Sequence, residues 1–140
     1  MEVDLALLAD AATIDASGKL NILGVFDRLT AASFPVQHPH LVLILRFSAG
    51  VPEMGKHQVE IRLRDPAGKE AMSIDGEMQL GAGPRALAQG VKVPHILHLD
   101  GLVFPTGGAY YFEVRVDGEH HVSVPLTVHA MAGRGGGAEA

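Results

Sequence analysis

The sequence predicts an all-β fold, an antiparallel β-sandwich of seven to nine strands. The 17 glycines and 8 prolines among 140 residues suit many short strands joined by turns. Hydrophobic residues make up 47% of the chain and none is tryptophan, which suits an aliphatic core. Apolar and polar residues alternate in several segments, and no segment has a convincing helical period. Strands at short spacing without a helix indicate two packed sheets.

Two strands are predicted near the N-terminus. Val3 to Ala12 has helical propensity, but its apolar residues at first alternate with Asp4, and a turn predicted at Asp15 to Lys19 leaves little room for a helix. We therefore predict a strand there. Leu20 to Phe26 is the next strand, and Ala31 to Phe34 is a candidate continuation of it after a bend.

The middle of the chain holds the longest apolar run. Pro35 to His40 is predicted as a loop because it contains two prolines. Leu41 to Phe47 follows as an apolar run broken only by Arg46, which is typical of a central strand buried on both sides. Alternatively, one face of this strand is an interface.

A hairpin is predicted around residue 66. Val59 to Arg64 alternates apolar with charged residues, and Asp65 to Gly68 has proline second and glycine fourth, as in a type I turn. This connection places Leu63 opposite Met72, so that the apolar faces of the two strands agree.

The segment after this hairpin is predicted to be a loop followed by an edge strand. Gly81 to Gly90 is predicted as a flexible loop with one helical turn at Arg85 to Ala88. Val91 to Phe104 supplies one bent strand or two short ones. Its Pro94 argues for a sheet edge, and Gly101 for a bulge or turn.

The last hairpin, Tyr110 to Val128, consists of two alternating apolar runs on either side of an Asp-Gly pair. A three-residue loop at 116–118, with Gly118 in the left-handed conformation, places Phe112 opposite Val122 and matches the two apolar faces. The alternative is a two-residue turn corrected by a bulge at residues 120 and 121.

Two residues of this hairpin carry further structural information. Tyr110, two residues ahead of Phe112, resembles the tyrosine corner of immunoglobulin-like sandwiches, although the cysteine pair and core tryptophan of antibody domains are absent. The sequence therefore favours an immunoglobulin-like variety. Pro125 falls on the polar face and has no N–H to donate, so its strand is predicted to be a sheet edge or bulged at that point.

The chain has the length of one domain. We predict a single sandwich domain over residues 1–129 and a disordered glycine-rich tail over residues 130–140. The lack of cysteine excludes disulfides and thiolate chemistry. Acidic residues stand where a signal peptide has lysine or arginine, so we expect a cytoplasmic protein. No run approaches the roughly 20 apolar residues that cross a bilayer.

The charge of the chain argues against nucleic-acid and membrane partners. The formal net charge is −5, and the 11 lysines and arginines are scattered without a cluster. Binding to a phosphate backbone or an anionic lipid surface needs a basic patch. We therefore expect neither partner.

The 8 histidines are the one compositional feature with chemical content. Three pairs are close in the sequence: His38 and His40, His95 and His98, and His120 and His121. Positions 95 and 98 of a strand point to opposite faces, as do 120 and 121, so solvated histidine is the preferred interpretation and no metal ligand is predicted. A metal-dependent enzyme using His38, His40, His120 or His121 is the least favoured hypothesis.

No enzymatic signature is present. The aspartates mostly lie at predicted strand ends, where they form turns, and there is no Asp-x-Asp pair of the kind found in calcium loops. The serines lack a G-x-S-x-G setting, and the sequence Gly81 to Pro84 lacks the lysine of a phosphate-binding loop. We predict no catalytic residue and no cofactor.

Several motifs spread along the chain match those of a known family. They are Leu8 to Ala12 followed by Gly18 to Gly24 and Asp27-Arg28, the hairpin Arg62 to Gly68, and the segment Phe112 to Glu119. With these motifs the chain resembles an uncharacterised family of small single-domain bacterial β-sandwich proteins, over nearly all its length except the tail. The resemblance implies a bacterial cytoplasmic sandwich and brings no activity, cofactor or catalytic residue.

The sequence thus predicts a non-catalytic protein-binding or self-assembly module. An excess of apolar strand, with no site signature beside it, points to a sheet edge or face that contacts another protein or a second copy. The alternative is a small-molecule or lipid binder with a pocket between the sheets. We expect the binding edge at Leu41 to Phe47 or in the first strand rather than in the strand of Pro125.

Overall fold

The computed structural model describes residues 1–50, 55–80 and 90–131. These residues form nine strands and no helix: β1 (Glu2–Ile14), β2 (Leu20–Phe26), β3 (Arg28–Ala31), β4 (Val36–Ala49), β5 (Gly55–Arg64), β6 (Glu70–Leu80), β7 (Val91–Phe104), β8 (Gly108–Val116) and β9 (His120–Ala130). Accordingly, no helix in the described part of the chain could cross a membrane. The predicted all-β fold is confirmed.

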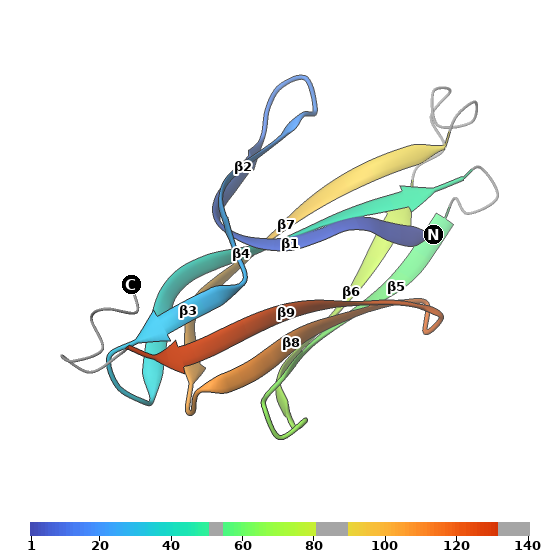
Figure 1. The fold of residues 1–140 in the computed structure, drawn as a ribbon. Coiled ribbons are helices and arrows are strands. Elements are labelled where there is room, and N and C mark those ends of the chain that lie inside the picture. Colours follow the sequence, from blue (N-terminus) through green and yellow to red (C-terminus); the bar gives the residue numbers. More distant parts are fainter. Residues whose placement is uncertain (51–54, 81–89, 132–140) are drawn as a thin grey trace.

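The strands form two sheets that pack as a sandwich (Figure 1). Sheet A has the order β2-β1-β4-β7, and sheet B has the order β3-β9-β8-β5-β6. Neighbouring strands are antiparallel except β3 and β9, which run parallel. The exception arises because the chain crosses from sheet A to sheet B at Asp27, whose carbonyl accepts a hydrogen bond from Thr127 N at 2.9 Å. The candidate continuation of β2 at Ala31 to Phe34 is therefore replaced by β3, which begins earlier and lies in the other sheet.

The main core lies between the two sheets. The largest fully buried side chains include Leu41, Leu43, Leu45 and Phe47 on β4, and Tyr110 and Phe112 on β8. These residues alternate with outward-facing ones along each strand, as the period of two requires. Each such side chain stabilises the fold by roughly 1.5 to 3 kcal/mol through burial.

Strand β4 is apolar on both faces because both faces are covered. Val42 and Ile44 alternate with the core residues, are 0% exposed, and form a second cluster with Ala9 on the outer side of sheet A. Partly buried residues of the β1–β2 hairpin pack on this cluster, among them Leu20 and Ile22. The predicted central strand is confirmed, and its second face is covered by the chain itself.

Two pairs of strands, β1 with β2 and β4 with β7, bend where a glycine has a positive φ. The β1–β2 register skips the position of Asp10 and Gly24, and Gly24 has φ 74°. Beyond this bend the hairpin rises from the outer side of sheet A (Figure 1). The β4–β7 register skips Pro39 and Gly101, and Gly101 has φ 66°. Glycine reaches this conformation without the steric cost that a side chain imposes.

The loop predicted at Pro35 to His40 is wrong, because β4 begins at Val36. Strand β1 pairs with β4 only as far as Val42, so at Pro39 the strand has a neighbour on one side alone. The pairing with β7 also skips Pro39, so its missing N–H leaves the ladder intact. The predictions for the neighbouring strand β7 are confirmed: β7 is one bent strand, and Pro94 lies at a sheet edge.

Both hairpins of sheet B, β5–β6 and β8–β9, form where the sequence predicts them. Leu63 pairs with Met72 across the predicted turn. The β8–β9 loop has three residues, with Gly118 at φ 72°, but it spans 117–119, so Phe112 faces Val124 and the predicted partner Val122 is wrong. The observed register keeps Val116 in the strand, where it is 1% exposed.

Two further predictions about this hairpin are supported. Pro125 lies beyond the end of the pairing between β3 and β9, so β9 is an edge at that point. The Tyr110 hydroxyl donates a hydrogen bond to the carbonyl of Thr106 at 2.7 Å, the backward bond of a tyrosine corner. The immunoglobulin-like variety stays a prediction, which this bond supports.

Two predictions fall mainly on residues outside the described ranges. They are the loop at Gly81 to Gly90 and the tail at residues 130–140. Strand β9 extends to Ala130, and Met131 is the last described residue. The division into a domain over residues 1–129 and a tail stays a prediction.

Candidate interaction surface

The outermost strands of the two sheets differ in how they are protected from pairing with another strand. Unpaired strand edges attract further strands, and proteins block them with charges, proline or short length. Strand β7 carries Lys92, Pro94 and Asp100, strand β6 carries Glu70, Asp75 and Glu77, and β3 has 4 residues. Strand β2, with the sequence LNILGVF, has 7 residues and carries neither charge nor proline. It is the least protected of the four outermost strands in the described part.

The β1–β2 hairpin turns apolar side chains toward solvent. Leu23 and Val25 on β2 are 72% and 62% exposed, and Ile14 near the hairpin turn is 45% exposed. The side opposite Leu23 covers the second cluster through Leu20 and Ile22, and Ile14 lies on that same side because it pairs with Leu20. The hairpin is therefore apolar on two sides, of which the described chain covers one.

The structure moves the expected binding edge from β4 to β2. Leu41 to Phe47 lies between β1 and β7 and has no free edge. Strand β1 pairs with β2 from Leu8 onward, and its first half, which lacks a neighbour on that side, carries Glu2 and Asp4. The sequence identified β2 as a strand but did not show that it is an outermost strand, because the neighbours of a strand cannot be determined from its own residues. The available signal was the uncharged run from Leu20 to Phe26.

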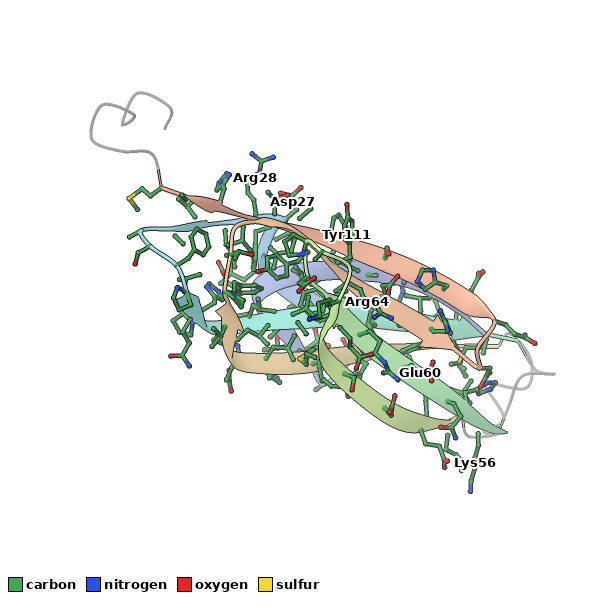
Figure 2. The ribbon with its side chains drawn as sticks, turned by 90° about the horizontal axis from the view of Figure 1, so that it is seen from below. Asp27, Arg28, Lys56, Glu60, Arg64 and Tyr111 are labelled. Atoms are coloured by element: carbon green, nitrogen blue, oxygen red, sulfur yellow. The ribbon has the colours of Figure 1, made fainter. Side chains whose placement is uncertain are left out.

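The outer face of sheet B is charged and internally paired. Arg62 contacts Asp75 at 2.8 Å and Glu70 at 3.2 Å, and Arg64 Nε contacts Glu113 Oε1 at 2.8 Å. Figure 2 shows Arg64 on this face, seen from below. The hydrogen bond from Arg64 lowers the pKa of Glu113 below its usual value, whereas burial opposes this with a smaller effect. Such a face stays hydrated, and its exposed aromatic residue is Tyr111, which pairs with Arg64 across β5 and β8 and is 43% exposed.

Two aspartates, Asp4 and Asp117, join separate parts of the fold through ionic contacts. Asp4 on β1 contacts Arg46 of β4 at 2.7 Å and Lys92 of β7 at 2.8 Å, and these hydrogen bonds lower its pKa, that from Arg46 most. Asp117 in the β8–β9 loop accepts hydrogen bonds from Gln58 N at 2.8 Å and contacts His57 Nδ1 at 2.6 Å. The bond with His57 is the main cause of the lowered pKa of Asp117.

The histidines singled out by the sequence do not all come together: His40 and His98 meet, whereas His38 and His121 lie elsewhere. His38 lies 6.3 Å from the ring of Phe26, measured between ring centroids, and His40 stacks on His98 and contacts Asp100. His121 lies on the outer face of sheet B, 3.5 Å from Glu113. The side chain of His120 is outside the described part. Within residues 1–50, 55–80 and 90–131, no three histidine or carboxylate side chains converge as a metal site.

An apolar opening of about 120 Å³ lies between the sheets. It is lined mainly by β4, β5, β6 and β7, with Phe47, Ile61, Met78 and Leu97 among its residues, and His95 also borders it. Pockets that bind small molecules usually have roughly 300 to 1,000 Å³. The opening is therefore small for a ligand of that size.

One family model matches both the sandwich and the β1–β2 hairpin. A family model described as "Family of unknown function (DUF6941)" matches residues 4–129. The chain belongs to this family. The match to DUF6941 begins in β1 and ends in β9, so it includes the β1–β2 hairpin as well as both sheets. A search of curated proteins found no match.

Proposed function

We propose that this DUF6941 chain is a non-catalytic protein-binding or self-assembly module that uses β2 as its binding strand. The observation that carries the proposal is the contrast among the outermost strands. Strand β2 is uncharged over 7 residues and exposes Leu23 by 72%, while the others carry charge or proline or have 4 residues. A free edge of this kind binds an extended strand through backbone hydrogen bonds.

The chemistry of the edge fits addition of a strand. Each free N–H and C=O of β2 forms a hydrogen bond when a partner strand pairs with it, and the apolar area of Leu23 and Val25 leaves water at the same time. Burial of such area contributes about 25 cal/mol per Å². The backbone bonds supply general affinity, and the exposed side chains supply specificity.

We also expect the module to act in the bacterial cytoplasm. A chain without cysteine needs no oxidising compartment. The family resemblance stated above supports the bacterial origin.

The test compares three tagged chains: wild type, Leu23→Lys and Val103→Lys. Val103 is 52% exposed on β7, so its substitution adds the same charge at an exposed apolar site on another strand. Each chain is incubated with cell extract and an excess of untagged chain, and the retained proteins are identified by mass spectrometry. We expect wild type and Val103→Lys to retain the same partner and Leu23→Lys to lose it, because lysine blocks edge pairing. Equal retention by all three chains, or by none, contradicts the proposal.

A further inference from the structure

We propose that the strand which pairs with β2 is β2 of a second copy, in antiparallel orientation about a two-fold axis at Leu23. This inference rests on the proposed function and names its partner. The free edge of β2 in one copy then pairs with the same edge in the other copy.

The residues on either side of β2 support a second copy through charge. Lys19 and Asp27 directly flank the strand, four residues before and four residues after Leu23. Antiparallel pairing centred on Leu23 places Lys19 of each copy opposite Asp27 of the other, so two opposite-charge pairs form by symmetry. A shift of the axis by one residue in either direction loses both pairs. Opposite charges that face each other across strands stabilise the pairing, and like charges destabilise it.

Both charged side chains are available for this contact. Lys19 has no side-chain ion pair or hydrogen bond with the described residues. Asp27 has a side chain that is 77% exposed, and its one ion pair is with its neighbour Arg28 at 3.7 Å. Figure 2 shows Asp27 and Arg28 at the margin of the molecule. Formation of the dimer therefore breaks no strong contact of the monomer.

The side chains of β2 also match themselves in this register. Leu23 meets Leu23 on the axis, Ile22 faces Gly24 of the other copy, and Asn21 faces Val25. The pair of Ile22 and Gly24 places a large residue opposite a residue without a side chain. A net charge of −5 makes two copies repel each other, so contact is favoured where the surface carries no charge, which is the property of β2.

Cysteine crosslinking reads this register directly, because the chain has no native cysteine. Residues that face each other in antiparallel strands have Cα atoms about 4.5 to 5.5 Å apart, within the range of a disulfide. Under mild oxidation Leu23→Cys should form a covalent dimer at least about 10-fold faster than two control variants. Asn21→Cys tests the register, because residue 21 faces residue 25 of the other copy. Val103→Cys tests random collision at an exposed site on β7.

Charge reversal tests the same register without touching the apolar residues. In sedimentation experiments at chain concentrations up to about 1 mM, we expect Lys19→Asp and Asp27→Lys each to weaken dimerisation about 2- to 30-fold. The double variant should restore it, because the two pairs form again with reversed sign. Circular dichroism and melting temperature verify that each variant is folded.

The outcomes separate this inference from the proposed function. Preferential crosslinking at Leu23→Cys with charge rescue supports the β2–β2 dimer. Any one of three results overturns it. The chain is a strict monomer, all three cysteine variants crosslink at equal rates, or the double charge variant dimerises as weakly as the single variants. If the chain is monomeric but retains another protein in a Leu23-dependent manner, only the second-copy inference fails. If it is monomeric and retains nothing, both fail.

Discussion

The outer faces of the two sheets are built in opposite ways. The outer face of sheet B is a set of charged side chains that pair with one another, such as Arg64 with Glu113 at 2.8 Å. The outer face of sheet A has an apolar centre at Val42 and Ile44, which are 0% exposed under the chain's own hairpin. A charged face is stable in contact with water, whereas a large apolar face has to be covered by other protein residues.

This difference explains why β2 is the exposed edge. A hairpin that covers an apolar face needs apolar residues on the side turned inward, and those of β2 include Leu20 and Ile22. Its outer side has no such requirement, yet Leu23 is apolar there and is 72% exposed. Covering sheet A accounts for one side of the hairpin, and the partner contact that we propose accounts for the other.

The comparison predicts that the second cluster of sheet A contributes to stability as a core does. Ile44→Ala should lower the free energy of unfolding by about 2 to 5 kcal/mol, a loss comparable to the roughly 3 to 5 kcal/mol expected for Phe112→Ala between the sheets. Urea denaturation measures both. Val25→Ala, at an exposed site of the same hairpin, should change stability by no more than about 0.5 kcal/mol. A loss below about 1 kcal/mol for Ile44→Ala would show that the hairpin covers sheet A only loosely.

A second prediction concerns the bend that directs the hairpin over sheet A. Gly24→Ala forces a side chain into φ 74° and places its Cβ against the carboxylate of Asp10. The left-handed conformation alone costs about 1 to 2 kcal/mol, and moving the Asp10 carboxylate adds to this. Gly18→Ala is the matched control, because Gly18 has φ 86° with nothing within 4 Å. Equal losses in thermal denaturation would contradict a tight approach of Asp10 to Gly24.

The sequence predicted elements with local signals and missed those decided by neighbours. Leu41 to Phe47 was predicted as a buried central strand because its pattern is apolar at every position but one. Pro39 led to the wrong prediction of a loop, because a proline disrupts a strand only where its missing N–H would bond to a neighbouring strand. At this position β4 has no β1 neighbour, and that is visible only in the fold. The β8–β9 loop shows the same limit. Its length and its glycine followed from parity, but its position one residue later, which places Asp117 against Gln58 of another strand, is visible only in the fold.

The contact at Asp117 provides a third test, since sheet B depends on charge where the hairpin of sheet A does not. Hydrogen bonding to His57 lowers the pKa of Asp117 below its ordinary value of 3.8. The contribution of the carboxylate is therefore fully present above that value and is lost as the pH falls through the lowered pKa. Asparagine keeps an acceptor for Gln58 N and tolerates the φ of 52°, so Asp117→Asn removes mainly the charge.

We expect Asp117→Asn to be less stable than wild type by about 1 kcal/mol near pH 6, a value reduced by the partial exposure of the side chain. The difference should shrink toward zero in acid. Urea denaturation at several pH values measures it. A difference that stays constant from neutral pH to below the lowered pKa would show that charge is not what Asp117 contributes.

The smallest effect is expected for the ion pairs on the outer face of sheet B. Arg64→Gln removes the contact with Glu113, and because both side chains are about a third exposed the loss should be about 0.2 to 1 kcal/mol. Salt of about 1 M should reduce the difference, since it shortens the Debye length to about 3 Å. Lys56→Gln is the control: its contact with Glu77 is 3.8 Å long and more exposed, so we expect no measurable change.

The loss of stability in Ile44→Ala should persist at the same salt concentration, because it comes from apolar burial. If salt reduced both losses equally, the two outer faces would not differ in the way their residues indicate.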